Sequence, residues 1–490
     1  MTPITITYIG GGSKAWAHKY FADLLTQSKL EGELRLYDID IPAAQRNKRF
    51  FDKLVKTNPD KIKSQWRCEV FEDIDSALAG ADFVIISILP YLMKNMYVDV
   101  HYPQRYGIWQ SVGDSAGAGG YSRALRTIPS YIFFAQKIRE NCPNAWVINY
   151  TNPMSMCMNT LYREFPEIKA FGCCHEVFGT QNLICRIAGM YLALSEEGRR
   201  AFMASNLKAV KAELEAQGRD FNDFKSFKTF SRQTMQTNVQ GVNHFTWINK
   251  AEHDGLDLMP ICAAYARMFE ENAIAYLKGV NPIKKRLRNV HHVKYTLFEK
   301  YGALAAAGDR HLAEFVPDLF LADRHVLQYG FELTPVWGRM LVNRLLMLVT
   351  ALAATPLYSP KIKGSGEEGI RQISAICGLG DFVTNVNLPN KGQLSNVVQG
   401  TAVETNAAFS LDSVVAIDAG EMPPGAAELV NIHARNQKDF VEAYFNQDKG
   451  MLEEVFCRDP QVARIGAEKG KQLFAEMRRK NRKCLEEFIR

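Results

Sequence analysis

A short run of β-branched and aromatic residues near the start of the chain ends in three consecutive glycines. The run is Ile4–Ile9, the glycines are Gly10–Gly12, and a stretch with helical periodicity, Ala15–Gln27, follows. Gly10–Ala15 fits the pattern G-x-G-x-x-[GA] between a strand and a helix. A strand that enters a tight glycine turn and continues as a helix is typical of the first unit of a parallel α/β sheet.

Strand and helix patterns keep alternating through roughly the first 180 residues. Further apolar runs occur at Glu33–Asp38, Ala81–Leu89 and Ala145–Tyr150, and helical stretches occur at Ile41–Thr57 and Ala124–Asn141. Strands that are apolar on both faces are typical of parallel sheets covered by helices. The alternation therefore predicts an α/β fold with a doubly wound, Rossmann-like parallel sheet.

The rest of the chain is expected to form a second, mainly helical α+β lobe. A strand-like piece, Asp381–Asn390, interrupts the helical patterns. These patterns cover Leu194–Gln217, Leu256–Gly279, Pro335–Leu357 and Ala426–Arg490. We expect two domains, 1–190 and 191–490, packed together rather than joined by a flexible linker.

Composition argues against a nucleic-acid partner and against a membrane protein. The 59 basic and 53 acidic residues give a net charge of +6 over 490 residues, and the clusters Lys284–Arg288 and Arg478–Lys483 are expected to be solvated faces. The longest apolar stretch, Leu341–Leu357, contains Asn343 and Arg344 and predicts a buried helix. Ten scattered cysteines without a secretory signal predict free thiols and a cytoplasmic protein.

The glycine pattern predicts a dinucleotide site in the first domain. Gly10 allows the tight turn, Gly12 lets the backbone approach a pyrophosphate, and Ser13 continues the loop into the helix N-terminus. Asp38 ends the second strand, where an acid binds a ribose hydroxyl. Because this carboxylate would repel a 2′-phosphate, we expect NAD rather than NADP.

Two short motifs later in the chain hold candidate metal ligands. Cys174 begins the tetrapeptide CHEV after the apolar piece Lys169–Gly172, and His244 lies in Gly241–Trp247. A thiolate and an imidazole are suitable ligands for a divalent transition metal and leave positions open for substrate oxygens. From spacing alone, a core cysteine and a hydrogen-bonded core histidine remain the alternative.

The whole set of motifs resembles glycoside hydrolase family 4, the NAD- and divalent-metal-dependent glycosidases. The motifs occur in the family order along most of the chain. They are IGGGS at Ile9–Ser13, LYDID at Leu36–Asp40, GDSAGAGGYSRALRTIP at Gly113–Pro129, NYTNP at Asn149–Pro153, CHEV at Cys174–Val177, GVNHFTW at Gly241–Trp247, GDRHLAEF at Gly308–Phe315 and NLPNKGQ at Asn387–Gln393. The family fold is similar to that of lactate and malate dehydrogenases, in agreement with the sheet expected above.

The resemblance implies roles for the matching positions. Cys174 and His244 would bind the metal, commonly Mn²⁺; residues 1–190 would form the NAD-binding domain and residues 191–490 the metal- and substrate-binding domain. Asn152 would contact substrate hydroxyls near the metal, and Ser87 and Asn149 would lie along the NAD.

The resemblance leaves more than one candidate for the general acid and the general base. Members with Asp directly after the metal-binding Cys use it as the acid; here His175 takes that position and could protonate the leaving oxygen or bond a sugar hydroxyl. The base is a Tyr in some members and an Asp of a GD motif in others. The candidates for the base are Asp309 and Tyr301. The alternative for Asp309 is a purely structural salt bridge with its neighbour Arg310.

The tetrapeptide CHEV resembles that of the α-galacturonidase subgroup. A uronic acid carries a carboxylate, so the site should contain a cation, for which we expect Arg310 and His311, with Arg123 as a weaker candidate. Glu176 would bind a hydroxyl away from the carboxylate or pair with the arginine.

The implied activity is hydrolysis of α-galacturonides by NAD-assisted oxidation at carbon 3, elimination and re-addition of water, with a divalent metal. An α-glucuronidase or α-galactosidase of the same family is the alternative. A 2-hydroxy-acid dehydrogenase is a more distant one, and the chain lacks that class's G-x-H-G-D motif. The expected partner is a small-molecule glycoside, and we expect a homodimer or homotetramer, with Pro335–Leu357 as a candidate interface.

Overall fold

The computed structural model describes residues 1–13, 16–91, 93–227, 229–278, 291–321, 331–353 and 359–482. The basic cluster Lys284–Arg288 and Ala15 of the glycine pattern lie outside these ranges, as do the ends of the helical stretches predicted to reach Leu357 and Arg490.

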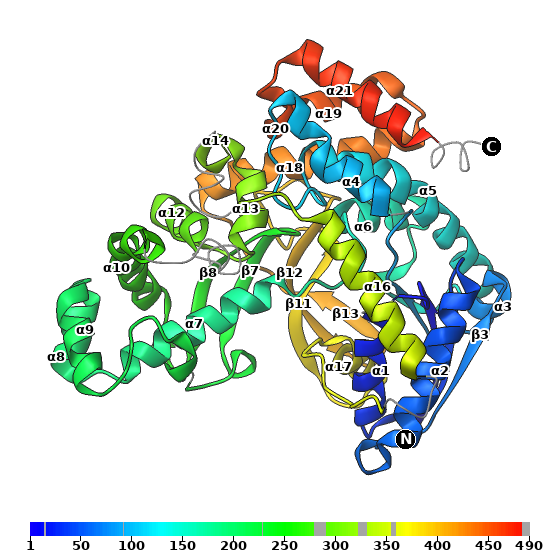
Figure 1. The fold of residues 1–490 in the computed structure, drawn as a ribbon, viewed down its shortest axis with the longest axis horizontal. Coiled ribbons are helices and arrows are strands. Elements are labelled where there is room, and N and C mark those ends of the chain that lie inside the picture. The colour runs from blue at the N-terminus through cyan, green and yellow to red at the C-terminus, as the bar shows by residue number, and fades with distance from the viewer. Residues whose placement is uncertain are drawn as a thin grey trace.

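A nine-stranded sheet forms the centre of the molecule (Figure 1). Its first six strands pair in parallel in the order β3-β2-β1-β4-β5-β6. They are β1 (Thr2–Ile9), β2 (Leu30–Tyr37), β3 (Trp66–Phe71), β4 (Phe83–Ile86), β5 (Trp146–Asn149) and β6 (Lys169–Gly172). This is the doubly wound dinucleotide-binding order, so the predicted fold class is confirmed.

Helices cover both faces of this sheet. One core contains side chains of the helices α1 (Trp16–Thr26), α2 (Ile41–Thr57) and α17 (Gly369–Ile376). The core on the opposite face contains side chains of α3 (Ile74–Leu78), α5 (Gly117–Asn141) and α6 (Met154–Glu164). Because both faces are buried, the strands are apolar throughout, as the sequence indicated.

Three strands from late in the chain extend the same sheet. They are β11 (Phe382–Pro389), β12 (Ala402–Ser410) and β13 (Ser413–Ala416). β11 pairs antiparallel with β6, and β12 and β13 follow it antiparallel. The strand predicted at Asp381–Asn390 is therefore confirmed, but it joins the first lobe's sheet. The domain boundary near residue 190 stays a prediction.

A second body, green at the left of Figure 1, packs around a small sheet. Its strands are β7 (Gln236–Val242), β8 (Phe245–His253), β9 (Leu256–Asp257) and β10 (Leu304–Ala305). The surrounding helices are α7 (Glu176–Leu192), α8 (Glu196–Met203), α9 (Leu207–Ala216), α10 (Met259–Lys278) and α12 (His292–Tyr301). Apolar side chains of these helices and of β7 and β8 form one core.

The remaining helices lie between and above the two bodies. They are α4 (Met93–His101), α13 (Asp309–Phe315), α14 (Pro317–Phe320), α16 (Val336–Ala353), α18 (Pro424–Phe445), α19 (Lys449–Arg458), α20 (Pro460–Ala463) and α21 (Ala467–Lys480). Side chains of α13, α18 and the β7–β8 hairpin share a core, which brings the GVNHFTW and GDRHLAEF motifs together.

Two sequence expectations about helices were wrong. The single charged helix expected over Leu194–Gln217 is two helices, α8 and α9, separated at Ser205, whose φ of 56° is left-handed and ends the first helix. α16 is not buried, because Leu341 and Leu345 are 60% and 52% exposed. Among the described residues, no helix combines the length and apolarity needed to cross a membrane.

Candidate active site

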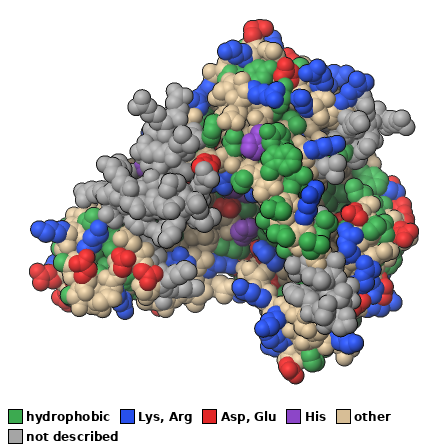
Figure 2. Space-filling view, in the orientation of Figure 1, with side chains coloured by type: hydrophobic (Ala, Val, Ile, Leu, Met, Phe, Trp, Pro, Cys, Tyr) green, Lys and Arg blue, Asp and Glu red, His purple; other side chains and the backbone are tan. Residues whose placement is uncertain are grey.

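The chemistry-bearing motifs meet at the carboxyl ends of the parallel strands. The glycine loop follows β1, Ser87 follows β4, Asn152 comes shortly after β5, and Cys174 follows β6. Ligands of doubly wound sheets bind at this edge. Figure 2 shows a recess between the α16 side of the molecule and the α7–α10 body, with histidine, acidic and basic side chains at its back.

The glycine loop is packed as tightly as a dinucleotide loop requires. Gly10 has a φ of +96°, and a Cβ there would collide with the Ser87 carbonyl. A Cβ on Gly12 would lie 2.8 Å from both Ala43 Cβ and Asp38 Oδ2. The glycines therefore let the backbone turn directly over β4 and α2.

Asp38 holds this loop from the end of β2. Its Oδ2 accepts a hydrogen bond from Gly12 N at 2.8 Å, and its Oδ1 accepts one from Asp40 N at 2.9 Å. Burial raises the pKa of Asp38, and these two N–H groups oppose the increase. The carboxylate thus lies beside the glycine loop, where the sequence placed it.

Ser87 and Asn149 line the strand ends but take part mainly in internal contacts. Ser87 N donates to Ile9 O at 3.0 Å. Asn149 is fully buried, and its Oδ1 accepts from Tyr131 Oη at 2.5 Å and from Thr151 N at 2.9 Å. The amide of Asn149 therefore fixes the loop that leads to Asn152, and a role along NAD stays a prediction.

The β7–β8 hairpin presents His244 to the sheet edge. His244 occupies its two-residue turn with a φ of 64°, is 4% exposed, and its Nδ1 lies 2.8 Å from Ser115 Oγ. Ser115 Oγ also lies 2.9 Å from Asp114 Oδ1, which is 3.6 Å from His244 Nδ1. The turn therefore connects the hairpin to the loop before α5.

Asp114, His244 and His311 form a cluster that could hold a metal ion. One ligand atom from each lies within 4.8 Å of the others. His311 Nδ1 is buried without a hydrogen bond, 3.8 Å from Asp114 Oδ1, and the two histidine rings lie 4.0 Å apart. A buried imidazole nitrogen without a partner costs free energy unless something binds it.

The charges in this cluster support one another. Burial alone would raise the pKa of Asp114, but the hydrogen bond with His244 and the charges of His311 and Arg123 hold it well below its usual range. Burial opposes protonation of His244, but Cys174 and Asp114 raise its pKa well above the usual value. The cluster thus already attracts positive charge.

Cys174 adjoins the same cluster. Its thiol and the His244 imidazole act on each other's protonation, so the structure brings the two predicted metal ligands near each other, although the ligand atoms within 4.8 Å of one another are those of Asp114, His244 and His311. Burial raises the pKa of the thiol, and His244 opposes the increase. A bound cation would favour the thiolate, the form in which cysteine binds metals.

Glu176 and Gly308 join the CHEV and GDRH motifs. Glu176 Oε2 accepts a hydrogen bond from Gly308 N at 2.9 Å. Although burial raises its pKa, the charges of His311 and His244 and this N–H lower it to about 2. Glu176 therefore faces the histidines rather than an arginine.

Asp309 begins α13 and is buried against the start of α12. Its oxygens accept from Val293 N and Lys294 N, both at 3.3 Å. Burial raises the pKa of Asp309 to about 6, opposed by the charge of Lys294 and by these N–H groups. Lys294 Nζ is held by Thr180 Oγ1 at 2.6 Å and by two backbone carbonyls. A pKa near the working pH suits a general base.

The two other candidates for proton transfer have different surroundings. Tyr301 ends α12 and packs edge-on against Trp247, with ring centroids 5.8 Å apart. The side chain of His175 is 51% exposed, and its Nδ1 lies 3.7 Å from Glu367 Oε1. His175 also lies 5.7 Å from the Trp16 ring, so it faces the side of α1 and the glycine loop.

The guanidinium of Arg310 donates hydrogen bonds to oxygens of the protein itself. Its Nη2 donates to Ser111 O at 2.6 Å, to Glu332 O at 2.9 Å and to Thr334 Oγ1 at 3.1 Å. No ion pair with Asp309 is found among the described residues. Burial, followed by the charge of His244, lowers the pKa of His311 to about 4, so His311 takes up a proton less readily than an ordinary histidine.

Arg123 lies behind Asp114 on α5. Its Nη1 is 3.8 Å from Asp114 Oδ2 and its Nε is 3.8 Å from Asp99 Oδ2. Asn152 Nδ2 donates to the same Asp114 oxygen at 3.3 Å. Arg123 and Asn152 thus both hold the carboxylate of the cluster.

Sequence reasoning did not single out two acids of this site, the partly buried Asp114 and the buried Glu404. Asp114 lay within the quoted GDSAGAGG motif, which was the available signal. Glu404 on β12 had no signal in the sequence. In the structure, Asn243 Nδ2 donates to its Oε2 at 3.0 Å and Asn385 Nδ2 donates to its Oε1 at 2.7 Å. These donors lie on separate hairpins, so only the fold reveals the cluster.

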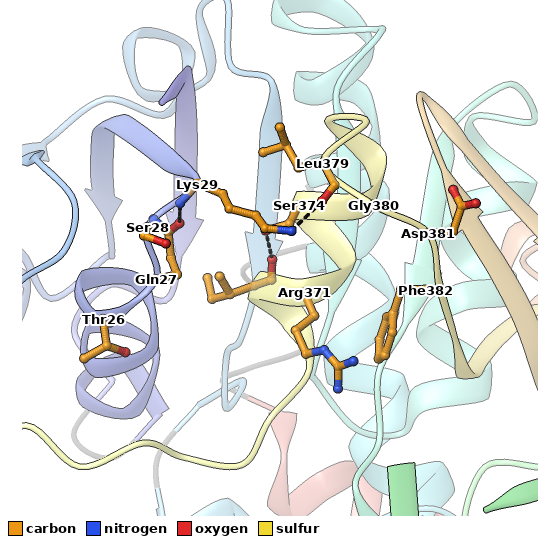
Figure 3. Close-up of a pocket in the computed structure, with 11 residues that line it drawn as sticks. Thr26, Gln27, Ser28, Lys29, Arg371, Ser374, Leu379, Gly380, Asp381 and Phe382 are labelled. Atoms are coloured by element: carbon orange, nitrogen blue, oxygen red, sulfur yellow. Dashed lines mark hydrogen bonds between the residues drawn. The ribbon is translucent and has the colours of Figure 1, made fainter. Parts of the chain in front are cut away.

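A pocket of about 330 Å³ lies elsewhere, between α1, the start of β2 and α17 (Figure 3). Lys29 Nζ crosses it to Leu379 O at 2.5 Å, and Arg371 lies 4.1 Å from the Phe382 ring centroid. Because Lys29 precedes β2, this pocket is at the amino ends of the parallel strands, opposite the motifs. It takes no part in the site.

Known proteins match this arrangement along nearly the whole chain. Residues 5–190 match the model of family 4 glycosyl hydrolases, and residues 239–462 match that of the family 4 C-terminal domain. An α-galacturonidase of Thermoanaerobacter italicus is 43% identical over 97% of this chain and 95% of its own length.

Solved structures agree with these matches. The crystal structure of lplD from Bacillus subtilis superposes with a TM-score of 0.81 at 38% identity, over 97% of this chain and 100% of that chain. A 6-phospho-α-glucosidase from gut microorganisms, in complex with NAD and Mn²⁺, superposes with a TM-score of 0.71 at 19% identity, over 99% of each chain. The second similarity concerns the fold.

Proposed function

The chain belongs to glycosyl hydrolase family 4, and on that basis we propose that it hydrolyses α-galacturonides. The observation that carries the proposal is the near-full-length similarity to an α-galacturonidase. The tetrapeptide from Cys174 to Val177 adds support, because it follows the strand end that holds the candidate metal ligand.

We infer that NAD is the nucleotide cofactor. The tight packing of Gly10 and Gly12 fits a dinucleotide pyrophosphate, and Asp38 lies where a ribose hydroxyl would be bound. Ser13 N donates to Gly10 O at 2.9 Å and keeps the loop closed. These residues would bind and orient the nucleotide beside Ser87 and the end of β5.

We infer a divalent metal, such as Mn²⁺, at the cluster of Asp114, His244 and His311 with Cys174. The unpartnered Nδ1 of His311 and the mixed sulfur, nitrogen and oxygen donors fit a transition metal. This adds Asp114 and His311 to the expected pair of ligands, Cys174 and His244, and gives His311 this role in place of its predicted role as a cation for the substrate. When bound, NAD and the metal supply hydride exchange and Lewis-acid polarisation of the sugar.

The chain's own residues supply proton transfer and orientation. Asp309, with a pKa of about 6, is the proposed base, and Tyr301 is the alternative. His175 is exposed at the start of α7 and is the proposed acid for the leaving oxygen. Asn152, fixed by Asp114, and Glu176, fixed by Gly308, would bind sugar hydroxyls.

A homo-oligomer is proposed from the exposed apolar face of α16. Trp337 and Leu348 on this helix are 70% and 61% exposed. Light scattering after gel filtration would measure the oligomeric state.

A cytoplasmic location is proposed because the described cysteines are free thiols.

A panel of 4-nitrophenyl glycosides tests the activity. With NAD⁺ and Mn²⁺ we expect turnover of the α-galacturonide well above that of the α-glucuronide and α-galactoside, and loss of turnover when either cofactor is removed. If only the α-glucuronide or only the α-galactoside were turned over, that glycoside would be the substrate in place of the α-galacturonide. Net NADH formation from lactate or malate would instead support a dehydrogenase.

A further inference from the structure

We propose that Arg339, on the first turns of α16, binds the carboxylate of the uronic acid and so determines the preference for an acidic sugar. This inference rests on the proposed function. It assigns the substrate's charge to a residue that lies outside every motif singled out in the sequence.

The start of α16 is fixed beside the metal cluster. Thr334 N donates to Ser111 O at 2.9 Å, and Arg310 Nη2 donates to Thr334 Oγ1 at 3.1 Å. Val336 packs in a small core with Met96 and Val100 of α4. The helix therefore begins next to the segment that carries Asp114, three residues beyond Ser111.

The guanidinium of Arg339 is close enough to this site to interact with its charges. Although the side chain is exposed, the surrounding protein lowers its pKa, and the charges of Asp114, Arg123 and Arg310 act on it. Arg339 is thus near enough to Asp114 for their charges to interact, while its side chain remains accessible from solvent.

Arg339 also differs from the nearby Arg310 and Arg123 in its contacts, because those two guanidinium groups already have partners within the described protein. Arg310 donates to three protein oxygens, and Arg123 lies between Asp99 and Asp114. Within the described ranges, no hydrogen bond or ion pair engages the Arg339 guanidinium. A carboxylate presented by a substrate would supply the partner, with two parallel hydrogen bonds.

Glu176 does not conflict with this assignment. Its carboxylate is bound by Gly308 N and faces the histidines, on α7. The sugar carboxylate would approach from the α16 side, where Arg339 provides the opposite charge.

The test compares an acidic substrate with its neutral counterpart. We expect the wild type to hydrolyse 4-nitrophenyl α-galacturonide with a kcat/KM about 10- to 100-fold above that of its methyl ester, as expected for a charge-assisted bond. Arg339→Gln should abolish this preference mainly through KM for the acid. Arg339→Lys should restore part of it.

Arg344→Gln is the matched control, because Arg344 is also exposed on α16 but five positions further along. It should keep the wild-type preference. An Arg339→Gln enzyme that folds, by its thermal unfolding, and still prefers the acid would overturn the inference. If Arg339→Gln does not fold, an unchanged preference in Arg339→Lys together with Arg339→Met would do so. A wild type inactive on both substrates would instead contradict the proposed function.

Discussion

Oδ1 of Asp114 lies 3.6 Å from Nδ1 of His244, and this contact joins the loop before α5 to the turn of the β7–β8 hairpin. Ser115 and Asn152 reinforce it from the same side. The contact brings an acid from the first body and an imidazole from the second to one point. A cation bound there would hold the two bodies together at the proposed catalytic centre.

Replacing Cys174 should remove metal-dependent activity. We expect Cys174→Ser to lose at least about 100-fold in kcat, because a serine hydroxyl is a poor ligand for Mn²⁺ compared with a thiolate. NAD⁺ binding, measured by titration calorimetry, should change little. An active, metal-responsive variant would remove the thiolate from the mechanism.

Asp114→Asn should weaken Mn²⁺ binding by about 10- to 100-fold, as expected for loss of a ligating or supporting carboxylate. Removing this charge should also lower the pKa of His244, whose protonation Asp114 favours. Calorimetric titration with Mn²⁺ gives the affinity. Wild-type affinity in this variant would show that the carboxylate plays no part in metal binding.

The pKa of Asp309 predicts how the activity falls at acidic pH. A general base must be ionised, so with a pKa of about 6 we expect kcat/KM to fall about tenfold per pH unit below pH 6. Asp309→Asn should lower kcat by about 100-fold or more at pH 7 and abolish this dependence.

Because Asp309 also receives two N–H groups of α12, the thermal unfolding of Asp309→Asn must be measured in parallel. A folded variant with wild-type kcat and an unchanged profile would transfer the base role to Tyr301. Tyr301→Phe is then the matched test of that alternative.

Gly12→Val should weaken NAD⁺ binding by at least about tenfold. Its Cβ would lie 2.8 Å from Asp38 Oδ2 and from Ala43 Cβ, so the loop must move away from β2 and α2. Fluorescence titration with NAD⁺ measures the change. Gly80→Ala is a suitable control, since nothing lies near its added Cβ, although its φ of +64° adds some strain.

Glu404→Gln should lower the free energy of unfolding by about 1 to 3 kcal/mol. The new amide would place a donor among the Asn243 and Asn385 amides that now donate to the carboxylate. Because Asn243 precedes His244 in the hairpin turn, Mn²⁺ affinity should fall as well. An unchanged free energy of unfolding in urea would show that the Asn243 and Asn385 amides tolerate a neutral group at position 404.

Part of this organisation was visible in the sequence because it is local. The run Ile4–Ile9, the glycines after it and the apolar strands reflect periodicity and steric limits over a few residues, and the structure confirms them as β1, β4 and β5. Cys174 and His244 were also recognisable as a pair, but only through the resemblance of their motifs.

Other features depended on which distant segments pack together. The carboxylate of Asp114 beside His244, the commitment of Arg310 to backbone carbonyls, and the unused guanidinium of Arg339 follow from contacts between elements far apart in the chain. The return of β11 to the first sheet is of the same kind. A sequence pattern fixes the face that a residue occupies on its own element, whereas burial and neighbouring charge come from the elements that meet it.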